Sequence, residues 1–278
     1  MATIEGLFIY PLKSGRGIPM PSVRVQATGF EWDRHWMTID LSGEFLTQRT
    51  HPQLARIVPE LTRDALILNA PGLPSLTLPT EPSGEPMSVR VWEDICTGLD
   101  QGDSAAQWVS QAIGVPTRLV RVAPSMQRLA NPKYAGPYPV PVAFPDAFPV
   151  LVCNRASLES LNRRMPEPVP MERFRPNIVL EGLEEFAEDR IDTLQLGEVT
   201  LRLVKPCTRC IITSTDQHTG ERSTNPLPVL RAFRFDRKLL GVKFGENAVI
   251  VAGTGATLER GTNCVATFKS AEAVATPG

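Results

Sequence analysis

Two cysteines separated by two residues form the sharpest chemical pattern in this sequence. Cys207 and Cys210 lie in Lys205-Pro-Cys-Thr-Arg-Cys-Ile-Ile-Thr213, after a strand-like run and before β-branched residues. Such a pair can be redox-active, can hold a structural zinc ion, or can contain one thiolate that acts alone. Two inert cysteines on a buried strand are the fourth possibility.

The neighbouring sequence favours some of these possibilities over others. A thioredoxin-like pair begins a helix, and Cys-Ile-Ile-Thr has low helix propensity. A zinc site needs two further ligands, but the sequence has no second C-x-x-C and only three histidines, His35, His51 and His218. Residues i and i+3 of a strand project to opposite faces, so we expect one thiolate to act alone, with the cations Lys205 and Arg209 beside it.

The composition excludes several classes of protein. The 278 residues carry 29 Lys and Arg against 30 Asp and Glu, a net charge of −1 that provides no basic field for nucleic acid or anionic lipid. No apolar run approaches the ~18 residues of a membrane span, and the N-terminus lacks a basic and then apolar leader. The five cysteines are odd in number and sparse. We expect a cytoplasmic protein with no nucleic-acid or membrane partner.

Short apolar runs cut by 26 prolines predict a mainly β protein of the α+β class. The clearest hairpin is Thr193–Val204, turning at Gly197-Glu198, with Leu194 opposite Leu201 on the buried face. A second is Trp36–Thr47, with its tip at Ser42-Gly43. Further strands are predicted at 7–10, 23–26, 65–68, 88–92, 117–122, 177–180 and 248–251.

Three segments have the pattern of short helices: 103–114, 156–164 and 228–234. A stretch rich in proline and glycine separates two β-rich parts and fits a linker or an active-site loop equally well. We therefore divide the chain into an N-terminal domain, 1–122, a connector, 123–143, and a C-terminal domain, 144–278.

Motifs along nearly the whole chain resemble one family. Arg173-Phe-Arg-Pro-Asn-Ile-Val-Leu-Glu-Gly182, the Leu-Gly-Glu-Val hairpin and the C-x-x-C segment resemble a MOSC domain, the molybdenum cofactor sulfurase C-terminal type. Tyr10-Pro-Leu-Lys-Ser14, Asp33-Arg-His-Trp36 and Thr47-Gln-Arg49 resemble the MOSC N-terminal β-barrel domain that precedes it. The arrangement is most similar to the mitochondrial amidoxime-reducing component and its bacterial counterparts.

The resemblance implies a MOSC-type β-barrel, a smaller N-terminal barrel-like domain and a molybdenum–pterin cofactor. The family reduces N-hydroxylated compounds, and the second cysteine of its motif, here Cys210, is the metal ligand, which leaves Cys207 a packing role. A soft thiolate suits molybdenum. Asp146 aligns with a Ser-Asp-Ala stretch at the family's cofactor pocket and is the second candidate catalytic residue, although Pro145 replaces the serine.

The terminal phosphate of the pterin requires fixed donors, and several positions match the family or begin a predicted helix. The candidate cofactor-binding residues are Lys13, Arg34, Arg175, Asn177 and, through backbone N–H groups, Asn154 and Arg155. Outside a motif, such cations are usually solvated, and Asn177 equally fits a structural turn. We expect Lys13, Arg34, Arg175 and Cys210 to meet in one cleft between the two domains.

The sequence leaves the source of electrons and protons open. It has no dinucleotide fingerprint and no ferredoxin-type cysteine cluster, so we expect a separate donor, a flavoprotein reductase with a cytochrome or ferredoxin. Asp146 and His35 are the nearest candidate acids. Expected substrates are small hydroxylamines, amidoximes and N-hydroxylated bases. A sulfur-carrier or cofactor-handling protein with a reactive cysteine is the alternative, and a β-rich binding module is a third.

Overall fold

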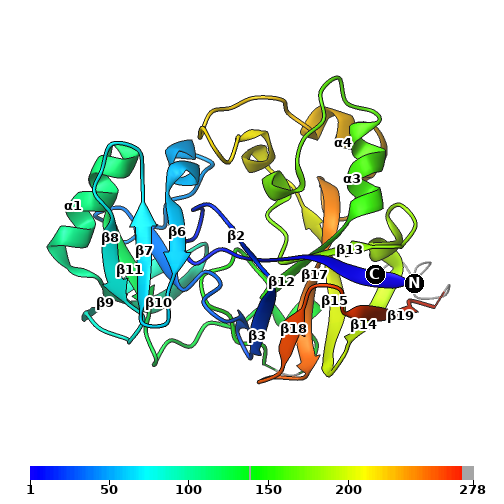
Figure 1. Cartoon of the computed structure of the whole chain (residues 1–278), viewed down its shortest axis with the longest axis horizontal. Coiled ribbons are helices and arrows are strands. Elements are labelled where there is room, and N and C mark those ends of the chain that lie inside the picture. The colour runs from blue at the N-terminus through cyan, green and yellow to red at the C-terminus, as the bar shows by residue number, and fades with distance from the viewer. Residues whose placement is uncertain (138, 271–278) are drawn as a thin grey trace.

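A computed structural model describes residues 1–137 and 139–270 of the chain. The described part is mainly β, as predicted, with a strand barrel in one lobe and smaller sheets in the other (Figure 1). Tyr138 of the predicted connector and residues 271–278 of the predicted C-terminal domain lie outside the described residues.

A closed barrel of seven strands forms the larger lobe. Its order around the ring is β12 (Val150–Asn154), β13 (Ile178–Glu181), β1 (Ala2–Ile9), β19 (Asn263–Phe268), β14 (Ile191–Leu196), β15 (Val199–Thr208) and β17 (Gly241–Ala252), which pairs back to β12. Closure leaves no free edge in the ring. Inward-pointing aliphatic side chains, among them Ile4, Val152, Leu194 and Leu201, form the core.

The predicted hairpin at 193–204 is confirmed. Leu196 pairs with Val199 and Leu194 with Leu201, in the expected register. Gly197 has φ of +58°, a left-handed conformation that glycine adopts without steric cost and that a two-residue turn needs. A hairpin made from adjacent residues can thus set the register of two barrel strands from local sequence alone.

Two sheets and one helix build the smaller lobe. The first sheet has the order β5 (Trp36–Ile39), β11 (Arg118–Val122), β10 (Asp94–Asp100) and β9 (Glu85–Val91). The second comprises β6 (Val58–Leu61), β7 (Ala65–Asn69) and β8 (Leu76–Pro79). Helix α1 (Gly102–Ile113) packs Trp108 and Val109 into the core of this lobe. A further three-stranded sheet, β18 (Thr257–Glu259), β3 (Ser22–Gln26) and β4 (Gly29–Phe30), belongs with the barrel, because its buried side chains pack into the barrel core.

The second predicted hairpin forms only in part. Gly43 has φ of +87° at the expected tip, and Asp40 N–H donates to Glu44 O at 2.8 Å. The returning segment makes an isolated bridge between Ile39 and Phe45 rather than a strand. The other side of β5 pairs with β11, so this strand is placed by a partner far away in the sequence.

The three predicted helices are present within one or two residues of the expected bounds. They are α1, α3 (Arg155–Asn162) and α4 (Leu227–Arg234), and Gly114 ends α1 with φ of +81°. In Figure 1, α3 and α4 lie together beside the barrel. The connector adds α2 (Pro132–Ala135), and its Ala135 and Val142 pack with Phe148.

Four 3₁₀ helices and two short strands complete the described elements. They are η1 (Pro52–Arg56), η2 (Met171–Phe174), η3 (Ala187–Arg190), η4 (Ile211–Ser214), β2 (Ile18–Met20) and β16 (Phe235–Asp236). Strand β2 pairs with β1, which itself belongs to the barrel although it precedes the smaller lobe in sequence. The chain therefore leaves the barrel at its start, builds the smaller lobe and returns. The predicted domain limits at 122 and 143 stay a prediction.

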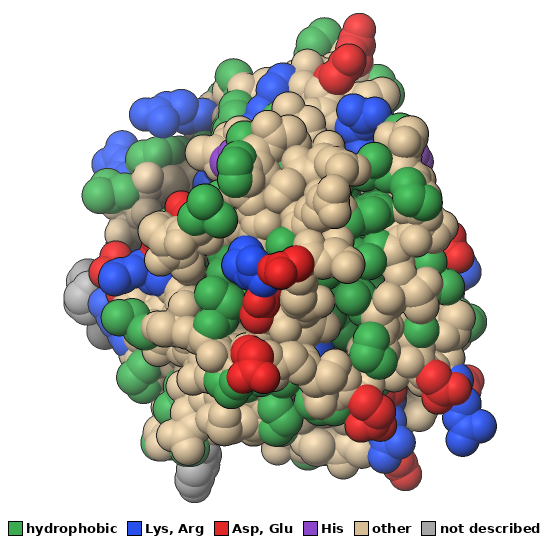
Figure 2. Space-filling view, turned by 90° about the vertical axis from the view of Figure 1, so that its left-hand side faces the viewer, with side chains coloured by type: hydrophobic (Ala, Val, Ile, Leu, Met, Phe, Trp, Pro, Cys, Tyr) green, Lys and Arg blue, Asp and Glu red, His purple; other side chains and the backbone are tan. Residues whose placement is uncertain are grey.

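The surface has no dominant charge on the face shown in Figure 2, where Lys and Arg side chains are scattered among Asp and Glu. This agrees with the net charge of −1. Among the described residues, no helix has the length and apolarity required to cross a bilayer.

We predict that Leu194→Ala lowers the free energy of unfolding by about 2–5 kcal/mol, because it leaves a cavity in the barrel core where Leu194 is 0% exposed. Asp192→Ala, on an exposed position of the same strand, is the control and should change it by less than about 0.5 kcal/mol. Urea denaturation measures both. Equal effects of the two variants would contradict the register described for β14.

Candidate functional site

A cavity of about 570 Å³ lies where the two lobes meet. The smaller lobe and its entry segments supply Lys13, Ser14, Arg34, Arg49 and Trp92, and the larger lobe supplies the rest. Those further residues are Pro145, Asp146, Ala147, Phe148, Leu151, Phe174, Arg175, Asn177, Lys205, Pro206, Cys207, Thr208, Arg209, Cys210, Ile212 and Asn247. Lys13, Arg34, Arg175 and Cys210 therefore line one cavity, as we expected from the sequence.

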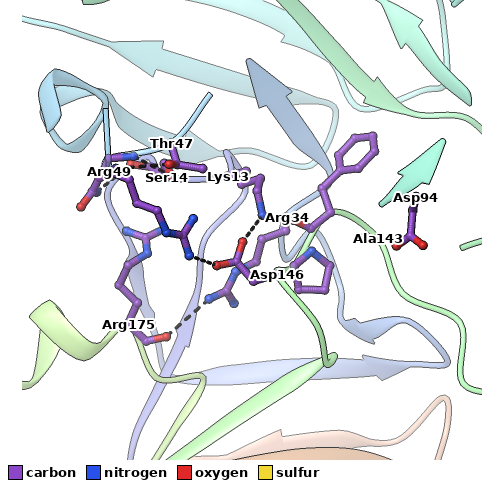
Figure 3. A network of polar contacts seen from close by, with 12 residues as sticks. Lys13, Ser14, Arg34, Thr47, Arg49, Asp94, Ala143, Asp146 and Arg175 are labelled. Carbon is purple, nitrogen blue, oxygen red and sulfur yellow. Dashed lines mark hydrogen bonds and ion pairs between the residues drawn. The ribbon is translucent and has the colours of Figure 1, made fainter. Parts of the chain in front are cut away.

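Positive charge dominates this cavity. Among the described residues, six Lys and Arg side chains line it against the single carboxylate of Asp146. Asp146 accepts from Lys13 Nζ at 2.6 Å through one oxygen and from Arg49 Nη2 at 2.7 Å through the other, as Figure 3 shows. One carboxylate thus bridges two cations that come from segments more than thirty residues apart.

Burial and the neighbouring carboxylate act in opposite directions on the pKa of Lys13. Burial lowers its pKa to about 8, while the carboxylate of Asp146 acts to raise it. Lys13 Nζ also donates to Phe144 O at 2.8 Å, so the ammonium is held by a carboxylate and a carbonyl. For Asp146, burial acts to raise the pKa, but Lys13 and Arg49 outweigh it and hold the pKa far below its usual range. Asp146 is therefore ionised at neutral pH.

Two arginines share one aromatic ring. The guanidinium carbons of Arg34 and Arg175 each lie 4.3 Å from the centroid of the buried Tyr10 ring. Arg34 donates to Asp33 Oδ2 at 2.5 Å, and Arg175 donates to Gly15 O at 2.6 Å. Burial lowers the pKa of Arg175 to about 10, so it stays protonated at neutral pH. The ring and these acceptors fix both cations at the cavity.

Strained backbone is concentrated around the cavity. Seven non-glycine residues among those described have a positive φ, and four of them line it: Ser14, Arg34, Trp92 and Arg175, with φ between +53° and +67°. A left-handed conformation costs free energy in any residue with a Cβ and persists where the surrounding structure enforces it. Such clustering is typical of functional sites.

Both cysteines of the C-x-x-C segment line the cavity, so the expectation that they point to opposite faces was wrong. That expectation assumes a regular strand, but the pairing of β15 with β17 shifts register between Leu203 and Lys205 and again between Pro206 and Thr208. Cys210 then lies beyond the strand, before η4. Arg209 Nη1 donates to Cys207 Sγ at 2.8 Å. Both thiols are half-buried.

Asn177 lines the cavity, but its amide is largely occupied by the protein. Its Oδ1 accepts from Leu151 N–H at 3.1 Å and from Arg34 Nη1 at 3.0 Å, and its Nδ2 donates to Phe8 O at 3.2 Å. These bonds join β1, β12 and the arginine, which favours the structural alternative for this residue.

The structure does not bring Asn154 and Arg155 to this cavity. Leu151 lines it near the start of β12, and Asn154 ends the same strand about 10 Å away. Asn154 caps α3 by accepting from Ala156 N–H, and Arg155 forms an ion pair with Glu5. The backbone N–H groups at the start of α3 consequently point to another part of the barrel surface.

His35 is also absent from the cavity lining. It is about 5.5 Å from Trp32, centroid to centroid, and burial lowers its pKa to about 4. The imidazole is therefore neutral at physiological pH and is a poor proton donor there.

Sequence reasoning missed several residues of the cavity as site residues. Arg49 lay within the quoted Thr-Gln-Arg motif, and Arg209 and Lys205 were noted only as cations near a thiol. Trp92 carried no local pattern beyond the end of a predicted strand, because its place depends on how the lobes meet. All four line the cavity.

Two family models match the chain. The MOSC N-terminal beta barrel domain matches residues 1–116, and the MOSC domain matches residues 139–262. Together they cover both lobes, and Cys207 and Cys210 lie within the second match.

Curated relatives match over most of the chain. The mitochondrial amidoxime reducing component 2 of Bos taurus is 36% identical over 84% of this chain and 73% of its own length. The mitochondrial amidoxime-reducing component 1 of Mus musculus is 36% identical over 84% and 72%, and that of Homo sapiens is 34% identical over 90% and 79%.

We predict that Asp146→Asn destabilises the protein more at pH 6 than at pH 9. The variant leaves Lys13 without its carboxylate, so the folded pKa of Lys13 falls below about 8, further from its unfolded value. A buried cation is then unpaired at pH 6, whereas Lys13 is largely neutral at pH 9 in both proteins. Urea denaturation at the two pH values measures the difference from wild type.

Asp94→Asn is the matched control, because Asp94 pairs with Arg128 at 2.8 Å and arginine stays protonated at both pH values. Its effect on stability should be the same at pH 6 and pH 9. If the Asp146→Asn effect were likewise independent of pH, the ion pair would not govern the charge of Lys13.

Proposed function

Because this chain belongs to the MOSC-domain family that includes the amidoxime-reducing components, we propose that it is a molybdenum-dependent oxidoreductase that removes oxygen from N-hydroxylated compounds. The observation that carries the proposal is the cavity itself, in which six cations surround an accessible thiol between the lobes.

The lining residues fit an anionic cofactor that accepts a thiolate. Six cations against one carboxylate leave an excess of positive charge that a phosphate-bearing pterin would offset. Arg49 Nη1 and Arg209 Nε are buried and have no hydrogen-bond partner among the described residues. Buried donors without partners cost free energy, so a ligand that accepts from them is favoured.

Different residues of the cavity would bind different parts of the cofactor. Lys13, Arg34 and Arg175 would hold the anionic part, and Cys210 would supply the soft ligand to the metal. When bound, the cofactor supplies two-electron redox chemistry that no side chain of the protein provides. Cys207, which accepts from Arg209, would stay outside the metal's ligands and keep that arginine in place.

Reduction of an N–OH group consumes two electrons and two protons and yields an N–H group and water. Asp146 is ionised and His35 is buried and neutral, so neither suits a proton donor at neutral pH. Burial lowers the pKa of Lys13 to about 8, so this ammonium can give up a proton near neutral pH. Asp146 instead orients Lys13 and Arg49.

The electrons would come from a separate donor protein, a flavoprotein reductase paired with a small cytochrome or ferredoxin. The relatives' names place those proteins in mitochondria, whereas the composition of this chain led us to expect the cytoplasm. The cytoplasmic location stays a prediction.

We predict that Cys210→Ala lowers bound molybdenum by about tenfold or more, because the variant lacks the soft ligand that the cavity offers the metal. The protein is produced in a host that makes the cofactor, and metal per chain is determined by elemental analysis. Reduction of benzamidoxime with a chemical electron donor should fall in parallel.

Cys207→Ala is the control. Cys207 lines the same cavity, is half-buried like Cys210, and accepts a hydrogen bond from Arg209. It should retain most of the metal. Folded wild type without molybdenum would contradict the proposed function and leave sulfur transfer or plain binding as the alternatives.

We predict that Arg34→Gln and Arg175→Gln each lower the amount of bound pterin, while Arg155→Gln does not. The first two residues line the cavity, and Arg155 lies outside it. Loss of one charge-assisted contact should weaken retention by about tenfold. Pterin is released by denaturation and oxidation and measured by its fluorescence. Equal losses in all three variants would contradict the placement of the anion in this cavity.

A further inference from the structure

Trp92 occupies an unusual position at the cavity. It is the first residue of the two-residue turn between β9 and β10, where Val91 pairs with Asp94. Its side chain is 44% exposed and forms part of the cavity wall. A large apolar side chain so exposed at a turn contributes little to the core, and sequence analysis gave no reason for it.

The backbone at Trp92 is strained. Its φ of +59° is the left-handed conformation that glycine favours at this position of a tight hairpin turn. A bulky residue there is an outlier that the rest of the structure must enforce. The strain places the indole beside the cavity, which indicates a role for the ring itself.

Neighbouring side chains fix the indole. The Phe45 ring lies 5.1 Å away at an interplanar angle of 60°, and the guanidinium of Arg49 lies over the indole at 4.8 Å from its centroid. Arg49 in turn is bonded to Asp146 at 2.7 Å. The indole thus contacts both Phe45 and Arg49, and Arg49 links it to the charged centre of the site.

We propose that Trp92 is a specificity-determining residue that packs against the ring of planar aromatic substrates while their N–OH group lies in the charged part of the cavity. The inference rests on the proposed function and adds to it a preference for substrates whose ring is flat over their saturated analogues. Flat rings stack on an indole with favourable dispersion and electrostatic contacts, and a puckered ring makes fewer such contacts.

Two neutral amidoximes separate ring planarity from the reacting group. Benzamidoxime has a flat ring, and cyclohexanecarboxamidoxime has a puckered ring of similar size. With no electron donor present neither compound is reduced, so calorimetry on the loaded protein measures binding alone. We expect wild type to bind benzamidoxime more tightly, and Trp92→Leu to weaken that binding about tenfold while it changes binding of the saturated compound less than about twofold.

Trp92→Phe retains a flat ring and should keep most of the preference. Trp92→Gly removes the ring and suits the turn, so it provides a folded variant if Trp92→Leu is unstable. Glu93→Gln, at the next and exposed position of the same turn, is the control and should leave both affinities unchanged.

Three results would overturn the proposal. Wild type could bind both amidoximes equally, or Trp92→Leu and Trp92→Gly could keep the preference. An equal loss for both compounds would show that Trp92 acts by positioning Arg49 and not by contact with the ring. Because binding is measured without turnover, a wild type that binds with the expected preference but reduces neither compound would contradict the proposed function and leave this inference standing.

Discussion

Repulsion among like charges in one cavity is the constraint on which the rest of this structure depends. Two unit charges 4 Å apart interact by about 4 kcal/mol at an effective dielectric constant of 20. The protein offsets part of this repulsion with Asp33 beside Arg34 and Asp146 between Lys13 and Arg49, and with backbone carbonyls that accept from Lys13 and Arg175. The positive charge that remains in the cavity favours the binding of an anion.

The backbone supports this arrangement at a cost in stability. Ser14, Arg34 and Arg175 adopt left-handed conformations, and each such residue costs about 1–3 kcal/mol. The barrel can sustain this cost because its core is aliphatic and its ring of strands is closed. Arg34 and Arg175 also lie against the same Tyr10 ring, so the strained backbone of two loops places two cations side by side.

Local sequence predicts local structure here, and long-range pairing limits what more it can predict. Gly197 and the apolar alternation around it suffice for one hairpin, and Gly114 marks the end of α1. No local pattern shows that β1 joins a barrel made mostly of later residues, or that bulges in β15 place Cys207 and Cys210 on one wall. The motifs identified Lys13, Arg34, Arg175 and Cys210, whereas Asn154 and Arg155 rested on a helix start whose direction only the fold decides.

The path of the chain explains why residues of the cavity are scattered along the sequence. Because β1 belongs to the barrel, the segment after it, with Lys13 and Ser14, leaves the barrel beside the site and contacts the smaller lobe, where Lys13 N–H donates to Trp36 O. The connector then returns the chain at Asp146, which bonds to both Lys13 and Arg49. Cations of both lobes line the cavity, so an anion that bound to them would contact both lobes at once, and its binding free energy would add to the stability of their interface.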